Sequence, residues 1–192
     1  MGVNTGRVTW LTISVGCALG ALGGLGQIGG AQGVADALGV NAIAVSCDVT
    51  QRADIDALVA ATVAQFGRLD IVVNNAGWTH KNQPLLDVDE ATFDRVYNIN
   101  VKSIFHMTHA VELGPDKIRV NAICPVMGAT GLLESFMGMP DTPENRQKFI
   151  ATIPLGRLSE PKDIARAAVY LGSDDAEFIS GVEFPVDGAR TV

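Results

Sequence analysis

Segments that suit β-strands alternate along this chain with segments that suit α-helices, and this alternation limits the folds open to it. Apolar and β-branched residues predict strands at Arg7–Val15, Asn41–Cys47, Leu69–Asn74, Ile118–Ile123 and Val182–Val186. Helices are predicted at Gln27–Leu38, at Arg52–Phe66, from Asp87 past Asn100 toward His109, from Thr142, and from Ser159 to Gly172. This order predicts an α/β fold, a three-layer, doubly wound parallel sheet with helices on both faces.

Two of the predicted helices have local start signals. Thr50 is expected to cap the helix at 52–66, because its hydroxyl can accept a hydrogen bond from a free N–H of the first turn. Asp87 and Glu90 have the spacing of a capping box for the next helix. In the first of these helices the apolar positions form one stripe, which consists of Ile55, Leu58, Val59, Thr62 and Val63.

Length and charge limit the classes of protein to which the chain can belong. Its 192 residues predict a single domain over 1–192, large enough to bury about 70% of the surface of the unfolded chain. The net charge of −7 argues against nucleic acid and against anionic lipid as partners, since both need clustered Lys and Arg. The 3 cysteines are widely spaced and predict neither a disulfide framework nor a metal site.

The N-terminal part resembles a secretory signal or a membrane span at first sight, because no charged residue occurs from Val8 to Ala35. Five glycines between Gly16 and Gly26 dilute this stretch, and no clear cleavage site follows it. We therefore expect a buried strand that leads into a glycine-rich loop, no membrane association, and a cytoplasmic protein.

The glycine-rich loop is the first candidate ligand site. Gly20, Gly24 and Gly26 give a G-x-x-x-G-x-G spacing, and Gly24 also opens an overlapping G-x-G-x-x-G. Bare glycines let the backbone approach a pyrophosphate, while the N-terminus of the following helix offers free N–H groups. A flexible loop is the alternative, since a segment this rich in glycine matches several templates by chance.

More specific motifs occur at the ends of later predicted strands. They are Asp48-Val49, the run Asn74-Asn75-Ala76-Gly77, Asn100 within Asn98–Lys102, and Pro125 followed by Thr130. In this arrangement and order they resemble the landmarks of the short-chain dehydrogenase/reductase family, and the resemblance covers most of the chain from Ala42 onward. Val126 departs from it, because the family usually has Gly there.

The resemblance implies an NAD(P)-dependent oxidoreductase that moves a hydride between a nicotinamide and an alcohol or ketone. It implies NAD or NADP as cofactor, a Rossmann-type sheet, and a possible homo-oligomer. Asp48 would contact the adenine, Thr130 would hold the nicotinamide amide, and Asn100 would distort its helix and anchor a proton-relay water. The implied cofactor-binding residues are Gly20, Gly24, Gly26, Asp48, Val49, Asn75, Ala76, Gly77, Pro125 and Thr130, and the implied catalytic residue is Asn100.

The sequence also departs from the family in a way that bears on catalysis. It contains no Tyr-x-x-x-Lys pair, and His109-Ala110 runs almost directly into Val111–Lys117. This junction resembles the front of one family helix joined to the back of the next, so the strand with the catalytic Ser and the helix with Tyr and Lys are absent. A second gap is expected between Gly26 and Asp48, which leaves a ribose-binding role open for Asp48. The expected sheet therefore has fewer strands than the family norm.

No other residues are expected to replace the missing acid/base pair. Tyr97 and Lys102 are five positions apart, which separates them by about 140° around a helix. His106 and His109 lie one turn apart without a matching carboxylate, so we expect no metal there. His80 is a candidate for lining a substrate pocket. The sequence thus predicts an oxidoreductase with impaired turnover; the alternative is a non-catalytic nucleotide-binding or interaction protein.

Overall fold

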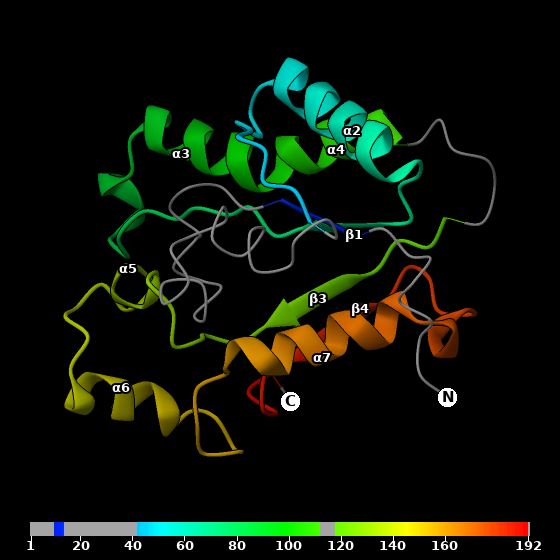
Figure 1. Ribbon diagram of the computed structural model, residues 1–192. Coiled ribbons are helices and arrows are strands. Elements are labelled where there is room, and N and C mark those ends of the chain that lie inside the picture. Colours follow the sequence, from blue (N-terminus) through cyan, green and yellow to red (C-terminus); the bar gives the residue numbers. More distant parts are fainter. Residues whose placement is uncertain (1–9, 14–41, 112–117, 192) are drawn as a thin grey trace. The chain divides into compact units, whose positions relative to one another are not determined.

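The computed structural model describes residues 10–13, 42–111 and 118–191 (Figure 1). These residues fall into two compact units, which are described separately. The N-terminal unit contains the described residues up to 111, and the C-terminal unit contains those from 118 onward. Both units combine helices with parallel strands, which confirms the predicted α/β class at this level. The predicted helix at 27–38 lies outside the described residues, and the single domain over 1–192 stays a prediction.

The N-terminal unit is built on one parallel strand pair. Strand β1 (Trp10–Ile13) pairs with β2 (Ile71–Asn74) in a register that places Trp10 opposite Ile71 and Ile13 opposite Asn74. Its helical elements are α2 (Arg52–Phe66), the 3-10 turn η5 (Leu85–Asp87), α3 (Glu90–Tyr97), the π-helical turn η6 (Asn98–Lys102) and α4 (Ser103–Val111). The last three follow one another without a break.

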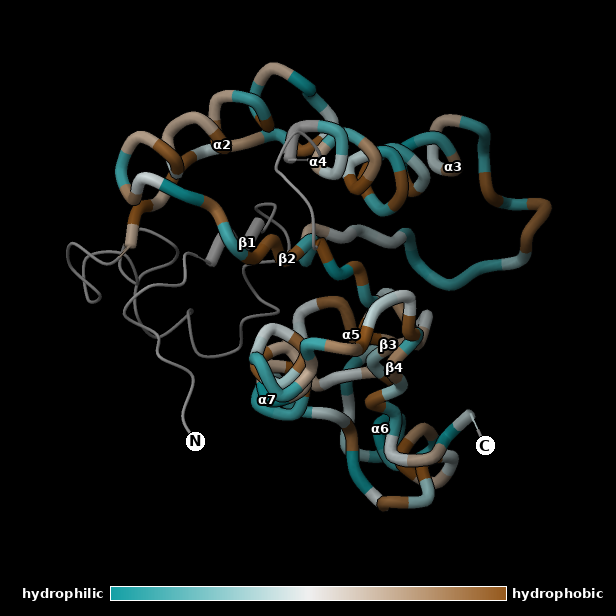
Figure 2. Tube along the Cα trace, turned by 90° about the vertical axis from the view of Figure 1, so that its right-hand side faces the viewer, coloured by the Kyte–Doolittle hydropathy of each residue, from teal (hydrophilic) through white to brown (hydrophobic). Residues whose placement is uncertain are grey.

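Helices α2 and α4 lie side by side and enclose the core of this unit (Figure 1). Val49, Ile55, Leu58 and Met107 are buried there, with Met107 contributed by α4. Hydrophobic and hydrophilic residues are intermixed along α2 (Figure 2), and its buried residues are Ile55, Leu58 and Thr62. The predicted stripe is confirmed for Ile55, Leu58 and Thr62, which are buried, whereas Val63 is exposed.

The C-terminal unit repeats the same pattern with a second strand pair. Strand β3 (Ala122–Pro125) runs parallel to β4 (Glu183–Val186), and α7 contacts both of them. The other helical elements are α5 (Leu133–Met137), α6 (Pro143–Ile150), α7 (Pro161–Gly172) and the 3-10 turn η7 (Asp174–Ala176). The buried core consists of Leu133, Met137, Ile153 and Leu158.

Several local predictions need correction. Residues 42–47 form no strand, because none of them joins a ladder with a neighbour, and a strand depends on that pairing. Thr50 does not cap α2; its backbone N–H and its hydroxyl both donate to Asp48 Oδ1 instead. Asp89, not Asp87, caps α3 by accepting a hydrogen bond from the Thr92 N–H, because η5 occupies 85–87.

The remaining helix starts agree with the sequence. Thr142 caps α6, and its hydroxyl accepts a hydrogen bond from the Asn145 N–H. Helix α7 begins at Pro161 and ends at Gly172, close to the predicted bounds. Among the residues that the structure describes, no helix is both long enough and apolar enough to cross a membrane.

The burial of Ile55 generates a stability prediction. Because Ile55 is 0% exposed, Ile55→Ala should leave a cavity and lower the free energy of unfolding by about 2–5 kcal/mol. Val63→Ala on the same helix is the matched control, since Val63 is 43% exposed and should change stability by less than about 0.5 kcal/mol. Urea unfolding followed by circular dichroism measures both, and equal losses would contradict the core assignment.

Candidate functional site

The loop after β2 is fastened to the helical run by one side chain. Asn100 Oδ1 accepts a hydrogen bond from the Trp78 N–H at 2.8 Å, and Asn100 Nδ2 donates to the Trp78 carbonyl at 2.7 Å. Both polar atoms of the Asn100 amide are therefore engaged with a single residue of the loop. A Cβ on Gly77 would lie 3.4 Å from Asn100 Oδ1, so a larger side chain there would press on this contact.

The reach of Asn100 depends on the π-helical turn η6. An i→i+5 turn inserts one extra residue into a helix and is frequent at functional sites. Ser103 Oγ, which is buried, donates to the Ile99 carbonyl at 2.6 Å within this turn. The helix is thus distorted at Asn100, as the family resemblance implies. Ser103 is bound to its own helix and is not placed as a nucleophile.

A contact that the sequence did not indicate holds the other side of Trp78. The Arg95 guanidinium lies over the indole ring, with Cζ 4.2 Å from the ring centroid. Such stacking is attractive because the face of the ring carries negative charge. The two residues are far apart in the sequence and no motif links them, so the pairing depends on how α3 passes the loop.

Asp48 and Val49 lie at the start of α2. Asp48 Oδ1 accepts hydrogen bonds from the Thr50 N–H at 2.9 Å and the Thr50 hydroxyl at 2.8 Å. The Asp48 N–H donates to Asp54 Oδ2 at 2.9 Å, which fixes the turn before the helix. The Asp48 carboxylate is exposed, whereas Val49 is 2% exposed and belongs to the core. A ligand contact by Val49 would therefore involve its backbone.

Ala76 connects this loop to the core, because it packs against the buried cluster that contains Val49. Asn75, one residue earlier, is exposed, and its N–H donates to the Val73 carbonyl at 3.0 Å. A small hollow in the N-terminal unit is lined by Val49, Ile55, Asn74, Ala76, Ser103 and Met107. In this region the loop residues are small or exposed, and the residues beneath the loop are mostly apolar.

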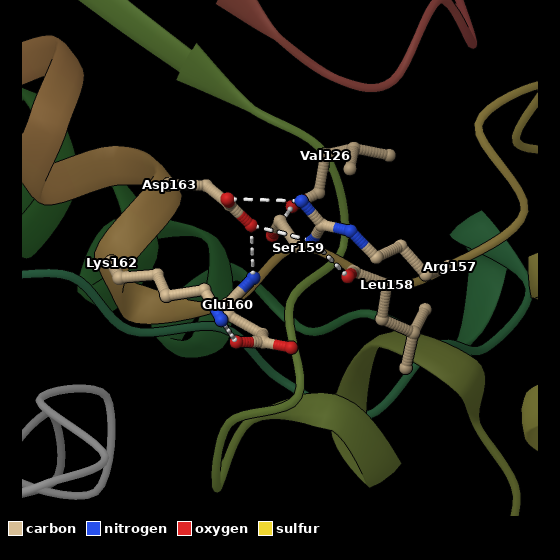
Figure 3. Close-up of polar contacts among 7 residues, drawn as sticks. All are labelled: Val126, Arg157, Leu158, Ser159, Glu160, Lys162 and Asp163. Carbon is tan, nitrogen blue, oxygen red and sulfur yellow. Dashed lines mark hydrogen bonds and ion pairs between the residues drawn. The ribbon is translucent and has the colours of Figure 1, made fainter.

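In the C-terminal unit, the segment after β3 contains the other two predicted residues, Pro125 and Thr130. Pro125 is exposed at the end of the strand. Gly128 forms a bridge to Ser159, and a Cβ on Gly128 would lie 3.0 Å from Ser159 Oγ, so a larger residue there would require Ser159 to shift. Ser159 Oγ also donates to the Val126 carbonyl at 3.2 Å (Figure 3). Thr130 is joined to this segment, because its N–H donates to the Gly128 carbonyl at 2.9 Å. The sequence did not reveal the contact between Gly128 and Ser159.

Further hydrogen bonds connect this segment with the start of α7 (Figure 3). Arg157 donates to both oxygens of Asp163, at 2.6 and 3.0 Å, and to the Leu158 carbonyl at 3.0 Å. The Glu160 N–H donates to Asp163 Oδ2 at 2.8 Å as half of a capping box. These hydrogen bonds, first from Arg157 and then from Glu160, hold the pKa of the Asp163 carboxyl well below its usual range.

The other titratable candidates are not arranged for proton transfer. Tyr97 is 52% exposed, and Tyr170 packs its ring 6.3 Å from that of Phe184. His109 Nδ1 lies 3.1 Å from Arg52 Nη1, and His80 Nδ1 lies 2.7 Å from the Lys81 carbonyl. No group of three or more potential metal ligands occurs within residues 10–13, 42–111 and 118–191.

Cys47 offers no nucleophile either. Burial, followed by the negative charges of Asp54 and Asp48, raises the pKa of its thiol. A thiol with a raised pKa stays protonated near neutral pH, and the thiolate is the reactive form.

The structure places the predicted site residues in two groups. Asp48, Val49, Asn75, Ala76, Gly77 and Asn100 belong to the N-terminal unit, where Gly77 and Asn100 are direct neighbours. Pro125 and Thr130 belong to the C-terminal unit. Gly20, Gly24 and Gly26 lie outside the described residues. The ligand roles of all these residues stay predictions.

Comparison with known proteins places the chain in a family. The family model described as enoyl-(acyl carrier protein) reductase matches residues 26–112 and 107–190. The chain belongs to the short-chain dehydrogenase/reductase family, as the strand-end motifs predicted. The match comes in two segments, and residues 107–112 are shared between them.

Individual relatives agree with this assignment. The chain is 38% identical to 4-formylbenzenesulfonate dehydrogenase of Comamonas testosteroni, covering 79% of this chain and 78% of the relative. It is 30% identical to 7alpha-hydroxysteroid dehydrogenase of Escherichia coli K12, covering 79% and 75%. A crystal structure of 3-ketoacyl-(acyl-carrier-protein) reductase from Brucella melitensis, complexed with NADH, matches with a TM-score of 0.78 and 32% identity over 97% of this chain and 99% of that one.

The Asn100 contacts generate a prediction about the loop. Asn100→Leu leaves both polar groups of the Trp78 peptide without their partner, which should lower the free energy of unfolding by about 1–3 kcal/mol. Trp78 fluorescence should shift to the red, read in a Trp10→Phe background so that Trp78 is the one remaining indole. Thr108→Ala, at an exposed position of α4, is the control. Unchanged emission and stability in Asn100→Leu would refute the anchoring role.

The Asp163 network generates a pH prediction. The pKa of Asp163 is lower in the folded chain than in the unfolded chain. Between these two pKa values the unfolded chain binds more protons, so stability rises with pH over this range. The contribution is complete above the ordinary carboxyl pKa, near 4, and is lost as the pH falls toward the folded value. Asp163→Asn should therefore lower the urea midpoint at pH 7, and the difference from the unaltered chain should shrink below pH 4. A difference independent of pH would contradict this assignment.

Proposed function

We propose that this chain is a nicotinamide-dinucleotide-binding member of the family, related to oxidoreductases that act on alcohols and ketones, with impaired turnover. The homologues support oxidoreductase function at the level of the family, and the crystallised reductase was complexed with NADH. NAD and NADP both remain open as the cofactor. A cytoplasmic location and a homo-oligomer are part of this proposal.

The residues of the N-terminal unit fit such a cofactor. Beyond β2 the chain continues through exposed Asn75 and the small residues Ala76 and Gly77, so the backbone is open to a ligand at the carboxyl end of a parallel strand. Asn100 fixes this loop, and Asp48 presents an exposed carboxylate at the start of α2, for either the adenine or the ribose role. The bound nicotinamide would supply the hydride, and these residues would orient it.

The observation that carries the impairment is the overlap of the two family-model segments at residues 107–112. One stretch of six residues aligns both with the end of the first segment and with the beginning of the second, as expected where the front of one helix joins the back of another. The alignment with the Comamonas dehydrogenase agrees, because it runs over 197 residues while using 79% of a 192-residue chain. The alignment therefore includes positions that this chain lacks.

The consequence for chemistry is the loss of proton transfer. A positioned general acid or base contributes about 10²–10⁴-fold to the rate. The described tyrosines lie at positions 97 and 170, and neither has a Lys four residues later. Within the described chain no histidine or tyrosine lies in hydrogen-bond contact with Asn100. Asn100 is then a positioning residue for the cofactor loop.

The second candidate function is a protein that binds the nucleotide or a partner and performs no chemistry. The same missing pair favours it. The two candidates differ in one measurable respect, since the first retains slow carbonyl reduction above the uncatalysed rate and the second does not.

Restoring the missing segment tests the proposal. A chimera that receives, between His109 and Val111, the corresponding segment of the Comamonas dehydrogenase should reduce an aromatic aldehyde at least about 10²-fold faster than the unaltered chain. The same chimera with the inserted Tyr changed to Phe is the control: it regains the segment without the acid. Reduction by the unaltered chain at a rate within tenfold of the relative's would refute the impairment.

A further inference from the structure

Two histidines of α4 lie beside the interface between α4 and α2. Met107 of α4 belongs to the buried cluster that contains Ile55 and Leu58 of α2, so the two helices share one core. His106 is next to Met107 in the sequence, and His109 follows three positions later, on the neighbouring part of the helix surface. The protonation states of these two rings therefore bear on how α4 packs against α2.

The contact between His109 and Arg52 of α2 fixes the form of the imidazole. His109 Nδ1 lies 3.1 Å from Arg52 Nη1. A guanidinium carries N–H donors and no acceptor, so Nδ1 must accept the hydrogen bond. Only a neutral ring with its proton on Nε2 can do this. A proton on Nδ1 would remove the hydrogen bond and place a second positive charge beside the first.

His106 is subject to a similar constraint for a different reason. Its Nδ1 atom is buried and has no hydrogen-bond partner within residues 10–13, 42–111 and 118–191. In the charged imidazole both nitrogens carry a proton, so Nδ1 would become a buried donor without an acceptor. Leaving a buried donor unpaired destabilises the folded state. The folded chain therefore favours the neutral form of His106 with the proton on Nε2.

The charged groups of α2 offer a protonated ring little compensation. Asp56 Oδ1 accepts a hydrogen bond from Arg52 Nε at 2.8 Å, and Asp54 Oδ2 accepts one from the Asp48 N–H at 2.9 Å. One oxygen of each carboxylate is thus already engaged. A charged His109 would have to compete with Arg52 for the carboxylate of Asp56.

The helical run offers no better partner, since residues 102–111 include no Asp or Glu. Lys102 lies one turn before His106 and adds positive charge. The Phe105 ring is tilted against both imidazoles, with its centroid 5.6 Å from that of His106 and 6.1 Å from that of His109. An exposed phenyl ring attracts a cation only weakly, so it does not replace the lost hydrogen bond.

We propose that His106 and His109 together form an acid-sensitive switch between α2 and α4. Below about pH 6.5, where an ordinary histidine gains a proton, uptake of protons by these rings loosens α4 from α2. The effect extends to the loop after β2, because α4 continues η6 without a break and Asn100 of η6 holds the Trp78 peptide. The movement of the loop needs no ligand; only its effect on dinucleotide binding rests on the function proposed above.

His80 provides an internal control. His80 Nδ1 lies 2.7 Å from the Lys81 carbonyl, and a carbonyl oxygen can only accept, so this nitrogen already carries a proton. A second proton on Nε2 leaves that hydrogen bond intact. His80 should therefore not contribute to the switch, although it lies two residues from Trp78.

Urea unfolding at about pH 7.5 and about pH 5.5 tests the switch, with Trp10→Phe as the background so that Trp78 is the one remaining indole. The unfolded chain binds protons that the folded chain excludes from these rings, so stability should fall as the pH falls. The ratio of unfolded to folded chain should rise about tenfold over this range for each ring that the fold keeps neutral, and up to about 100-fold for both. The emission maximum of Trp78 in the folded chain should move to the red at the lower pH.

Substitution of the two rings separates the switch from a general sensitivity to acid. His109→Gln keeps an acceptor for Arg52 that does not titrate, and His106→Leu removes the buried nitrogen. The double variant should lose the pH response of both the urea midpoint and the Trp78 emission, and each single variant should keep about one tenfold step. His80→Gln should respond as the background chain does.

A background chain whose unfolding ratio does not rise on acidification would overturn the proposal. A full response in the double variant, or loss of the response in His80→Gln, would overturn it as well. Trp78 emission that stays unchanged while the urea midpoint falls would contradict the link from α4 to the loop. If the double variant does not fold, the two single variants decide, and a full response in both would refute the switch.

Discussion

The hold of Asn100 on the Trp78 peptide is the interaction on which the candidate site depends. Two hydrogen bonds, at 2.8 and 2.7 Å, tie the loop after β2 to the π turn η6. Everything proposed for the loop requires that Asn75, Ala76 and Gly77 keep one conformation at the end of the strand. The π turn gives Asn100 its position, and Arg95 steadies the Trp78 ring from the other side.

The second constraint is that the sequence contains no Tyr-x-x-x-Lys pair. Without Tyr-x-x-x-Lys, the proposed nicotinamide site would have no proton donor beside the bound ligand. The two segments of the family match overlap at residues 107–112, near the end of α4. Loss of a segment there would affect both catalysis and the covering of neighbouring surfaces.

Much of the local structure could be predicted from the sequence because it depends on neighbours along the chain. The bounds of α2 and α7, the Thr142 cap and the distorted helix at Asn100 belong to this group. Predictions failed where a distant segment decided the outcome. Residues 42–47 are suitable for a strand but have no ladder partner. The cap of α3 is a local failure instead, because η5 uses the turn at 85–87 and Asp89 replaces Asp87.

The same distinction applies to the site. Gly77 and Asn100 could each be singled out from family motifs, but their contact could not be predicted. Two further contacts that steady the loops join residues with no sequence signal. Arg95, in α3, lies over the Trp78 ring, and Ser159, just before α7, pairs with Gly128. Val49, a residue within a recognisable motif, is buried as core, so its predicted ligand contact would involve its backbone.

Calorimetric titration of the unaltered 192-residue chain with NADH and with NADPH is the most direct test of the central claim. Saturable binding of at least one of the two is expected, with heat that disappears when Gly77 is replaced by Val, and at most slow oxidation of the bound cofactor when a carbonyl compound is added. Absence of heat with both dinucleotides would contradict a surviving cofactor site, and rapid oxidation would contradict the missing proton donor.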